Sequence, residues 1–244
     1  MKDAATRLAI DEAALADLIA ANHILYNQGV LDGFGHISLR HPGHPDSFLI
    51  ARSMAPALVT PRDIMWIGLD GVPREADAPR PYLERFVHAE IYRARPDVTS
   101  VVHCHSPAVL PFTVSKVPLR PVYHMAGFLV PDVPVFEIRD SFGPATDTLV
   151  RNAEQAVALA QCLGDRTAVL MRGHGATIVG STLRQAVFRA VYTDANARVQ
   201  LAAMQLGEPT YLTTAEGLAA ARTNDGQIDR DWALWRQRLS DASA

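Results

Sequence analysis

Two histidines separated by one residue end an apolar stretch of the chain, Val101-Val-His103-Cys-His105. Successive side chains of a β-strand point to opposite faces, so His103 and His105 would lie on one face with their backbones about 6 to 7 Å apart. A single histidine in an apolar segment is more often a hydrogen-bonded core residue than a ligand. Two imidazoles at this spacing, in contrast, can bind one metal ion.

A third histidine stands between two glycines, Gly173-His174-Gly175, where the chain passes from one apolar stretch to the next. Glycine lets backbone or a ligand approach closely, although the same composition also occurs in ordinary hairpin turns. Catalytic zinc sites use three protein ligands and keep an open position. The three histidines therefore predict one divalent metal ion per subunit, and imidazole ligands favour zinc, iron, cobalt, nickel or copper over magnesium or calcium.

The elements that must position these histidines can be read from the apolar periodicity. Helices are predicted over residues 11–29, 82–95, 146–163, 182–206 and 225–244, with a further one beginning near Pro107. Strands are predicted over residues 33–40, 47–51, 64–69, 98–104, 168–171 and 176–179. Strands and helices do not alternate strictly, which favours an α/β class with a largely antiparallel sheet between helices. We expect one domain, residues 1–244, with a C-terminal helical extension from about residue 212.

The composition excludes several classes of protein. The chain has 244 residues, 23 basic against 26 acidic side chains and a formal net charge of −3, so it lacks the basic field typical of nucleic-acid binding. No stretch approaches the roughly 20 apolar residues of a membrane span, and the first residues do not resemble a signal peptide. Two cysteines, Cys104 and Cys162, are too few for a disulfide scaffold. We therefore expect a cytoplasmic protein with reduced thiols.

Five motifs occur in the order and at the spacing of a known family: Gly35-His-Ile-Ser38, Glu84-Arg-Phe-Val-His88, Arg95-Pro-Asp97, Val101-Val-His-Cys-His105 and Gly173-His-Gly175. Over residues 14–206 the chain resembles the class II aldolase/adducin family. The resemblance implies a three-layer α/β/α fold and zinc bound by His103, His105 and His174. It also implies that Glu84 is an acid/base that reaches the metal. Spacing alone gives Glu84 no role, because a glutamate in the first turn of a helix is favoured by the helix dipole.

The departures from the family pattern concern the substrate. The aldolases hold a sugar phosphate with small or hydroxyl-bearing residues, and those positions here read His36, Ser53-Met54 and Tyr82-Leu83. Arg52 and Arg85 carry forked donors that suit a carboxylate. We therefore expect His36, Arg52, Ser53 and Arg85 to bind an aromatic or ring-derived carboxylic acid instead of a sugar phosphate.

One branch of the family also carries four segments found here, Tyr82 to Phe86, His103 to Pro107, Tyr123 to Met125 and Met171 to Gly175. That branch is similar to decarboxylases acting on 3,4-dihydroxyphthalate or on carboxylated hydroxymuconic semialdehydes in aromatic catabolism. The resemblance implies a metal-dependent carbon-carbon lyase that forms a metal-stabilised enolate, with zinc, manganese, cobalt or iron. It further implies a homotetramer with its sites between subunits, where His124 takes the place of a tyrosine acid of the aldolases.

Three other functions stay open at this point. An aldolase that cleaves a non-phosphorylated hydroxy-oxo acid would form the same kind of enolate and release pyruvate or an aldehyde. A non-haem iron oxygenase, which this fold also resembles, would consume oxygen. A non-catalytic protein such as adducin would lack a complete metal set, which the presence of His103, His105, His174 and Glu84 argues against.

Overall fold

A single sheet organises the protein, whose computed structural model describes residues 1–241. Among these residues, strands pair in the order β3-β2-β1-β4-β7-β6-β5. Their bounds are β1 His36–Arg40, β2 Ser47–Ala51, β3 Ile64–Gly68, β4 Ser100–Cys104, β5 Val135–Phe136, β6 Ala168–Met171 and β7 Gly175–Gly180. Every pairing is antiparallel except that of β5 with β6, which is parallel. The predicted, largely antiparallel sheet is thus confirmed.

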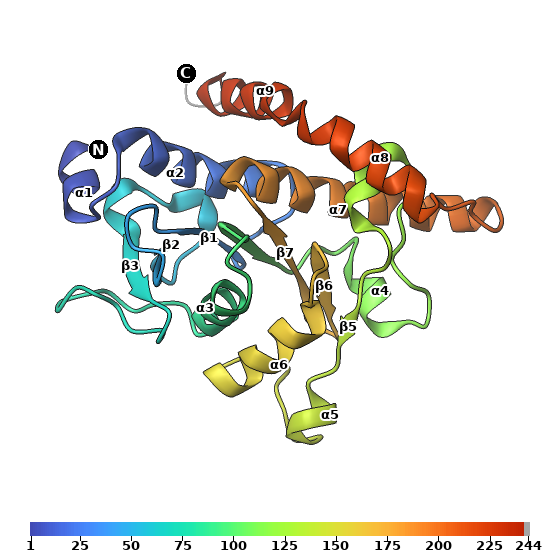
Figure 1. Ribbon diagram of the computed structural model, residues 1–244, viewed down its shortest axis with the longest axis horizontal. Helices are drawn as coiled ribbons and strands as arrows, with labels where there is room; N and C mark the ends of the chain where they lie inside the picture. The colour runs from blue at the N-terminus through green and yellow to red at the C-terminus, as the bar shows by residue number, and fades with distance from the viewer. Residues whose placement is uncertain (242–244) are drawn as a thin grey trace.

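Helices cover both faces of this sheet (Figure 1). Helices α2 (Glu12–Asn27) and α7 (Leu183–Leu206) pack on one face, with α9 (Ile228–Asp241) above them, and α3 (Arg85–Ala94) and α6 (Ala153–Leu163) lie together on the other. The remaining helical segments are α1 Lys2–Arg7, α4 Leu110–Val114, α5 Arg139–Phe142, α8 Thr214–Asp225 and the 3₁₀ turns η1 Pro56–Leu58, η2 Pro61–Asp63 and η3 His124–Leu129. The arrangement is the three-layer α/β/α fold that the family resemblance implied.

Local chemistry explains why the main elements begin where they do. The side chain of Asp11 accepts a hydrogen bond from the backbone N–H of Ala14 (2.7 Å), and that of Thr182 accepts one from Gln185 (3.0 Å), so both long helices have capped N-termini. Strands β2, β4 and β7 are buried along their whole length, because helices cover both faces of the sheet. These strands are therefore mainly apolar, and each polar side chain buried in them needs a specific partner.

Two predicted helices start later than expected, and both differences occur beside the histidines. The helix predicted from Tyr82 begins at Arg85, since Glu84 is its N-cap and turns its side chain toward His103 and His174. The helix predicted from residue 146 begins at Ala153, where Asn152 caps it. The residues before it form a loop in which Thr148 has a positive φ of 68°.

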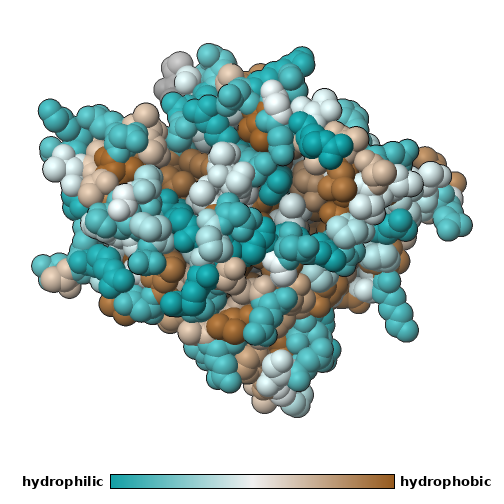
Figure 2. All heavy atoms as spheres, viewed as in Figure 1, coloured by the Kyte–Doolittle hydropathy of each residue, from teal (hydrophilic) through white to brown (hydrophobic). Residues whose placement is uncertain are grey.

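The other differences between the predicted and the observed helices concern their length and their first residues. The helix expected near Pro107 is limited to α4. The C-terminal helix expected from residue 225 is α9, which starts at Ile228 because the preceding helix α8 ends only at Asp225. Residues 242–244 of that prediction lie outside the described part of the chain. Within residues 1–241 no helix combines the length and apolarity needed to span a bilayer. On the face shown in Figure 2, hydrophilic side chains surround separate apolar patches.

Gly175, the first residue of β7, lies where two strands meet without room for a side chain. A Cβ at this position would stand 2.0 Å from the carbonyl oxygen of Cys104 on β4, and this backbone is fixed by the pairing of β4 with β7. We expect Gly175→Ala to lower the free energy of unfolding by about 2–4 kcal/mol and to displace His174. Thermal unfolding measures the loss, with Gly43→Ala as the control because an added Cβ there makes only ordinary contacts. Equal melting temperatures for the two variants would contradict this account.

Candidate metal centre

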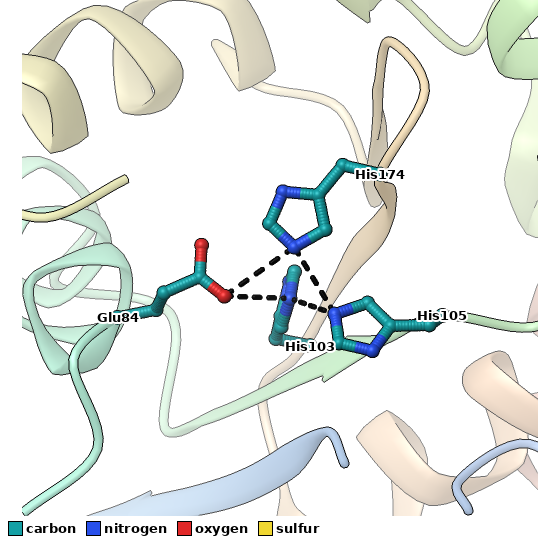
Figure 3. Close-up of side chains that lie close together, drawn as sticks. All are labelled: Glu84, His103, His105 and His174. Carbon is teal, nitrogen blue, oxygen red and sulfur yellow. Dashed lines mark hydrogen bonds and ion pairs between the residues drawn. The ribbon is translucent and has the colours of Figure 1, made fainter. Parts of the chain in front are cut away.

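Four side chains from three parts of the fold converge on one point (Figure 3). His103 lies on β4 and His105 follows the end of that strand, while His174 lies in the turn between β6 and β7. The pairing of Cys104 with Ala176 places this turn beside the end of β4. Glu84 reaches the same point from the start of α3. The three predicted histidines and Glu84 are therefore brought together.

The ligand atoms of these side chains lie close to one another. Nε2 of His105 is 3.1 Å from Nε2 of His103 and 3.0 Å from Nε2 of His174. Oε2 of Glu84 lies 3.4 Å from Nε2 of His103 and 3.3 Å from Nε2 of His174, and all four atoms fall within 4.8 Å. Donors about 2.05 Å from a tetrahedral zinc ion are roughly 3.3 Å apart. The spacing of the cluster fits such an ion.

Hydrogen bonds behind the cluster orient two of the imidazoles. Nδ1 of His174 donates to the carbonyl oxygen of Thr148 (2.9 Å). Nδ1 of His103 lies 3.2 Å from Oγ1 of Thr177, and that hydroxyl donates its own proton to the sulfur of Met171, so it accepts from His103. In a neutral imidazole the proton on Nδ1 leaves Nε2 with its lone pair. These lone pairs face each other, an arrangement that a cation stabilises.

The directions of the pKa shifts indicate which of these groups carry charge. Burial alone would raise the pKa of Glu84, but the neighbouring His103 and His174 outweigh it and lower that pKa, so the carboxylate is ionised. Burial would likewise lower the pKa of His174, yet its contact with Glu84 raises it. Burial and the two other histidines lower the pKa of His105 to about 4, which leaves this ring neutral. The donor set, three imidazoles and one carboxylate, suits a divalent transition metal or zinc.

A pocket of about 340 Å³ opens beside the cluster, and Glu84 and His105 form part of its wall. The rest of the wall is mainly apolar, with His36 and Ser53 as its other polar side chains. The lining residues are Gly33, Phe34, Gly35, His36, Ser53, Met54, Ala55, Tyr82, Leu83, Glu84, His105 and Leu149. A metal at the cluster would therefore have an open side facing an apolar pocket.

Two of the four residues expected to bind substrate are absent from this wall. Arg52 donates from Nε to Oδ1 of Asp63 (2.7 Å), and Arg85 donates to the carbonyl oxygens of Gly71 (2.7 Å) and Tyr82 (3.0 Å). In this structure Arg52 therefore contacts Asp63 through Nε, and Arg85 contacts backbone carbonyl oxygens, so neither residue lines the pocket. His36 and Ser53, in contrast, lie where they were expected.

His124 lies apart from the metal cluster of its own chain. It begins the 3₁₀ turn η3, is exposed, and lines a second hollow together with Phe188 and Asn224. Asn224 donates to the backbone carbonyl of His124 (2.8 Å). A single chain therefore does not unite His124 with Glu84.

Three residues that support the cluster were not predicted. Thr177 on β7 holds His103, the carbonyl of Thr148 holds His174, and the backbone N–H of Val150 donates to Oε1 of Glu84 (3.0 Å). Thr177 could have been found from the sequence, because it is a threonine within an otherwise apolar strand. Thr148 and Val150 act through their backbones, so their side chains carry no signal.

Comparisons with known proteins agree with this geometry. A family model described as "Class II Aldolase and Adducin N-terminal domain" matches residues 16–201. The decarboxylase tropJ of Talaromyces stipitatus is 36% identical over 240 residues, covering 89% of this chain and 90% of the relative. A 3,4-dihydroxyphthalate decarboxylase of a Terrabacter species is 33% identical over 240 residues, covering 93% of this chain and 97% of the relative.

The fold also has a counterpart among solved structures. L-fuculose 1-phosphate aldolase from Glaciozyma antarctica superposes with a TM-score of 0.76 at 20% identity, over 93% of this chain and 90% of the aldolase. At that identity the likeness concerns the fold alone. The family model, in contrast, spans most of the sequence, including all four residues of the cluster. The chain belongs to the class II aldolase and adducin family.

Proposed function

We propose that the protein is a metal-dependent decarboxylase of a hydroxylated aromatic or ring-cleaved dicarboxylic acid. The observation that carries this proposal is the convergence of three imidazole nitrogens and one carboxylate at the wall of an apolar pocket. Two relatives that are named decarboxylases and align with almost the whole chain support the same reaction.

The metal would be held by His103, His105 and His174, with Glu84 as a fourth ligand, and we propose zinc before manganese, cobalt or iron. Bound there, a divalent cation would supply the positive charge that stabilises anionic oxygens of a substrate and the charge left when a carbon-carbon bond breaks. The Nδ1 contacts of His103 and His174 keep their Nε2 atoms directed at the ion.

The pocket wall explains the preference for a ring over a sugar phosphate. Phe34, Met54, Tyr82 and Leu83 offer flat or apolar surface to a ring. The wall has no lysine or arginine that could hold a phosphate within the described residues. The hydroxyl of Ser53 and the imidazole of His36 remain to orient the oxygens of a carboxylic acid.

Glu84 would move the proton that the reaction needs. Because its carboxylate is ionised, it can take a proton from a substrate hydroxyl as the substrate binds. The bond between the ring carbon and the carboxylate then breaks, carbon dioxide leaves, and the electron pair stays on the carbon. Glu84 returns its proton to that carbon, so no further reactant is required.

We propose a cytoplasmic homotetramer with its sites between subunits, in which His124 serves the pocket of a neighbour as a proton donor. The exposure of His124 and its separation from its own cluster support this assignment. An equal mixture of His124→Ala and His103→Asn proteins, each inactive alone, is expected to regain about a quarter of wild-type activity after the subunits exchange. One site in four then combines an intact cluster with an intact His124 from the neighbour. Activity at the level of the unmixed variants would contradict it.

The proposed reaction is tested by carbon dioxide release from 3,4-dihydroxyphthalate and from a carboxylated hydroxymuconic semialdehyde, after loading the protein with zinc, manganese, cobalt or iron. Stoichiometric metal and carbon dioxide release support the decarboxylase. Pyruvate or an aldehyde would identify an aldolase and oxygen uptake an oxygenase, and either outcome overturns the proposal. A protein that binds none of the four metals would overturn it as well.

A further inference from the structure

Four polar side chains form a hydrogen-bonded chain behind the pocket wall. Nδ1 of His36 lies 2.6 Å from Nε2 of His88, Nδ1 of His88 lies 2.6 Å from Oγ of Ser38, and that hydroxyl lies 2.7 Å from the hydroxyl of Tyr92. All four side chains are buried. Buried polar groups are costly unless they are paired, so a complete chain of this kind is a specific structural feature.

Two elements build this chain through their natural periodicities. His36 and Ser38 are two residues apart on β1 and therefore share one face of the strand. His88 and Tyr92 are four residues apart on α3 and therefore share one face of the helix. The strand and the helix thus interleave their side chains in the order His36, His88, Ser38, Tyr92.

The contacts of Tyr92, at the end of the hydrogen-bonded chain away from the pocket, determine which atom donates in each of its hydrogen bonds. The hydroxyl of Tyr92 has two acceptors within reach, Oγ of Ser38 at 2.7 Å and the carbonyl oxygen of Thr99 at 3.4 Å. An O–H···O bond is normally 2.5–3.0 Å long, so we assign the single proton of the Tyr92 hydroxyl to the shorter contact, with Ser38, instead of to the carbonyl oxygen of Thr99. Ser38 then donates its own proton to Nδ1 of His88. Burial lowers the pKa of His88 to about 3, so this ring is neutral and carries its proton on Nε2.

The same order of donors and acceptors extends from His88 to His36 at the pocket. Nε2 of His88 donates to Nδ1 of His36, which leaves the proton of His36 on its own Nε2. Within the described residues, that Nε2 atom has no hydrogen-bond partner, and it is not among the side-chain atoms that are both fully buried and without a hydrogen bond. It therefore opens onto the pocket that His36 lines. The ring stands 5.0 Å from that of His103 and 4.4 Å from that of Tyr82, centroid to centroid.

We propose that Tyr92, Ser38 and His88 are positioning residues that hold His36 in its Nε2–H form, so that His36 donates a hydrogen bond to an anionic oxygen of the pocket ligand. The identity of that oxygen, a carboxylate or a deprotonated ring hydroxyl beside it, rests on the proposed function. A site built to donate to a substrate oxygen rejects analogues that lack it, because its own donor is then left unpaired. His36 is thus assigned a part in selecting oxygen-substituted rings.

Nuclear magnetic resonance tests the tautomer without any assumption about the reaction. In the full-length, zinc-loaded protein labelled with ¹⁵N-histidine, protonated and unprotonated ring nitrogens give well separated signals. The result expected for His36 is a protonated Nε2 and an unprotonated Nδ1. Adding 3,4-dihydroxybenzoate as a probe is expected to shift the Nε2–H signal. The reverse tautomer would overturn the proposal, and so would a signal that the probe leaves unchanged.

Variants test whether the chain sets that tautomer. Ser38→Ala removes the link between Tyr92 and His88, and we expect His36 to become a mixture of tautomers, with KM rising about tenfold and kcat changing less. Ser100→Ala is the matched control. Ser100 is also a buried serine, but it donates to the backbone carbonyl of Ser38 and is not part of the hydrogen-bonded chain from Tyr92 to His36. His36 unchanged in Ser38→Ala would overturn the positioning role.

A second variant, Tyr92→Phe, and the carbon dioxide release assay complete the test of the positioning role. If Ser38→Ala does not fold, Tyr92→Phe removes the terminal donor instead, and a shift of the His36 tautomer toward Nδ1–H is expected. An unshifted tautomer in that variant would contradict the direction assigned to the chain. Absence of carbon dioxide release from every substrate, together with the expected tautomer, would count against the proposed reaction but not against the positioning chain.

Discussion

His103→Asn is expected to lose bound metal and, with it, all measurable carbon dioxide release. His103 is fully buried, and its Nε2 lies 3.1 Å from Nε2 of His105 and 3.4 Å from Oε2 of Glu84. Zinc sites bind with about 10–16 kcal/mol, so one of four ligands accounts for roughly 3 kcal/mol, or about 10²-fold in affinity. Asparagine keeps a polar group at the position and limits the cavity that alanine would leave.

Metal content after dialysis against a limiting chelator measures this effect, together with circular dichroism to show that the fold persists. His44→Asn is the control, because His44 is exposed and lies against Trp66, away from the cluster. The control is expected to keep wild-type metal content. A His103→Asn protein that retains stoichiometric metal and activity would show that the cluster is not the metal site.

Glu84→Gln is expected to separate metal binding from chemistry. Glutamine has the size of glutamate, and its amide oxygen can still accept the backbone N–H of Val150, but it has neither the negative charge nor a transferable proton. We expect metal affinity to fall by about 10–100-fold, as for a weakened ligand environment. With metal at saturating concentration, kcat should still fall by about 10²–10⁴-fold, the usual contribution of a general acid/base.

Single-turnover carbon dioxide release in excess metal measures the chemical step in this variant. Glu90→Gln is the matched control, because Glu90 is a buried glutamate on the same helix that pairs with Arg93 instead of the cluster. The control is expected to keep wild-type turnover. If Glu84→Gln regained full turnover once metal was saturating, Glu84 would be a ligand only, and another group would move the proton.

The site was largely predictable where regular structure sets the spacing. His103 and His105 share a face because they lie at the end of a strand, and the alternation that this requires is visible in the sequence. Glu84 was not predictable from spacing, because its position at the start of α3 depends on the packing of that helix against the sheet. Its assignment came from the family resemblance.

Errors in the predicted elements have physical causes. Residues 146–152 were predicted to be helical, but backbone groups of this loop form hydrogen bonds with His174 and Glu84 instead of with one another. Strand β5 has only two residues, too few to show alternation. Helix α8 follows a capping box formed by Thr213 and Glu216, which the sequence displays, and it lies within the helical extension expected from about residue 212. Substrate binding by Arg52 and Arg85 stays a prediction, because spacing does not determine the direction of long side chains.

The loop before α6 has a consequence for how this protein can change over evolution. The carbonyl of Thr148 and the N–H of Val150 contact a histidine and a glutamate that come from different elements of the fold. Because Thr148 adopts a left-handed conformation that most residues disfavour, substitutions in this loop shift both contacts together. Metal preference could therefore drift, or be engineered, through a surface loop while every residue that touches the ion stays the same.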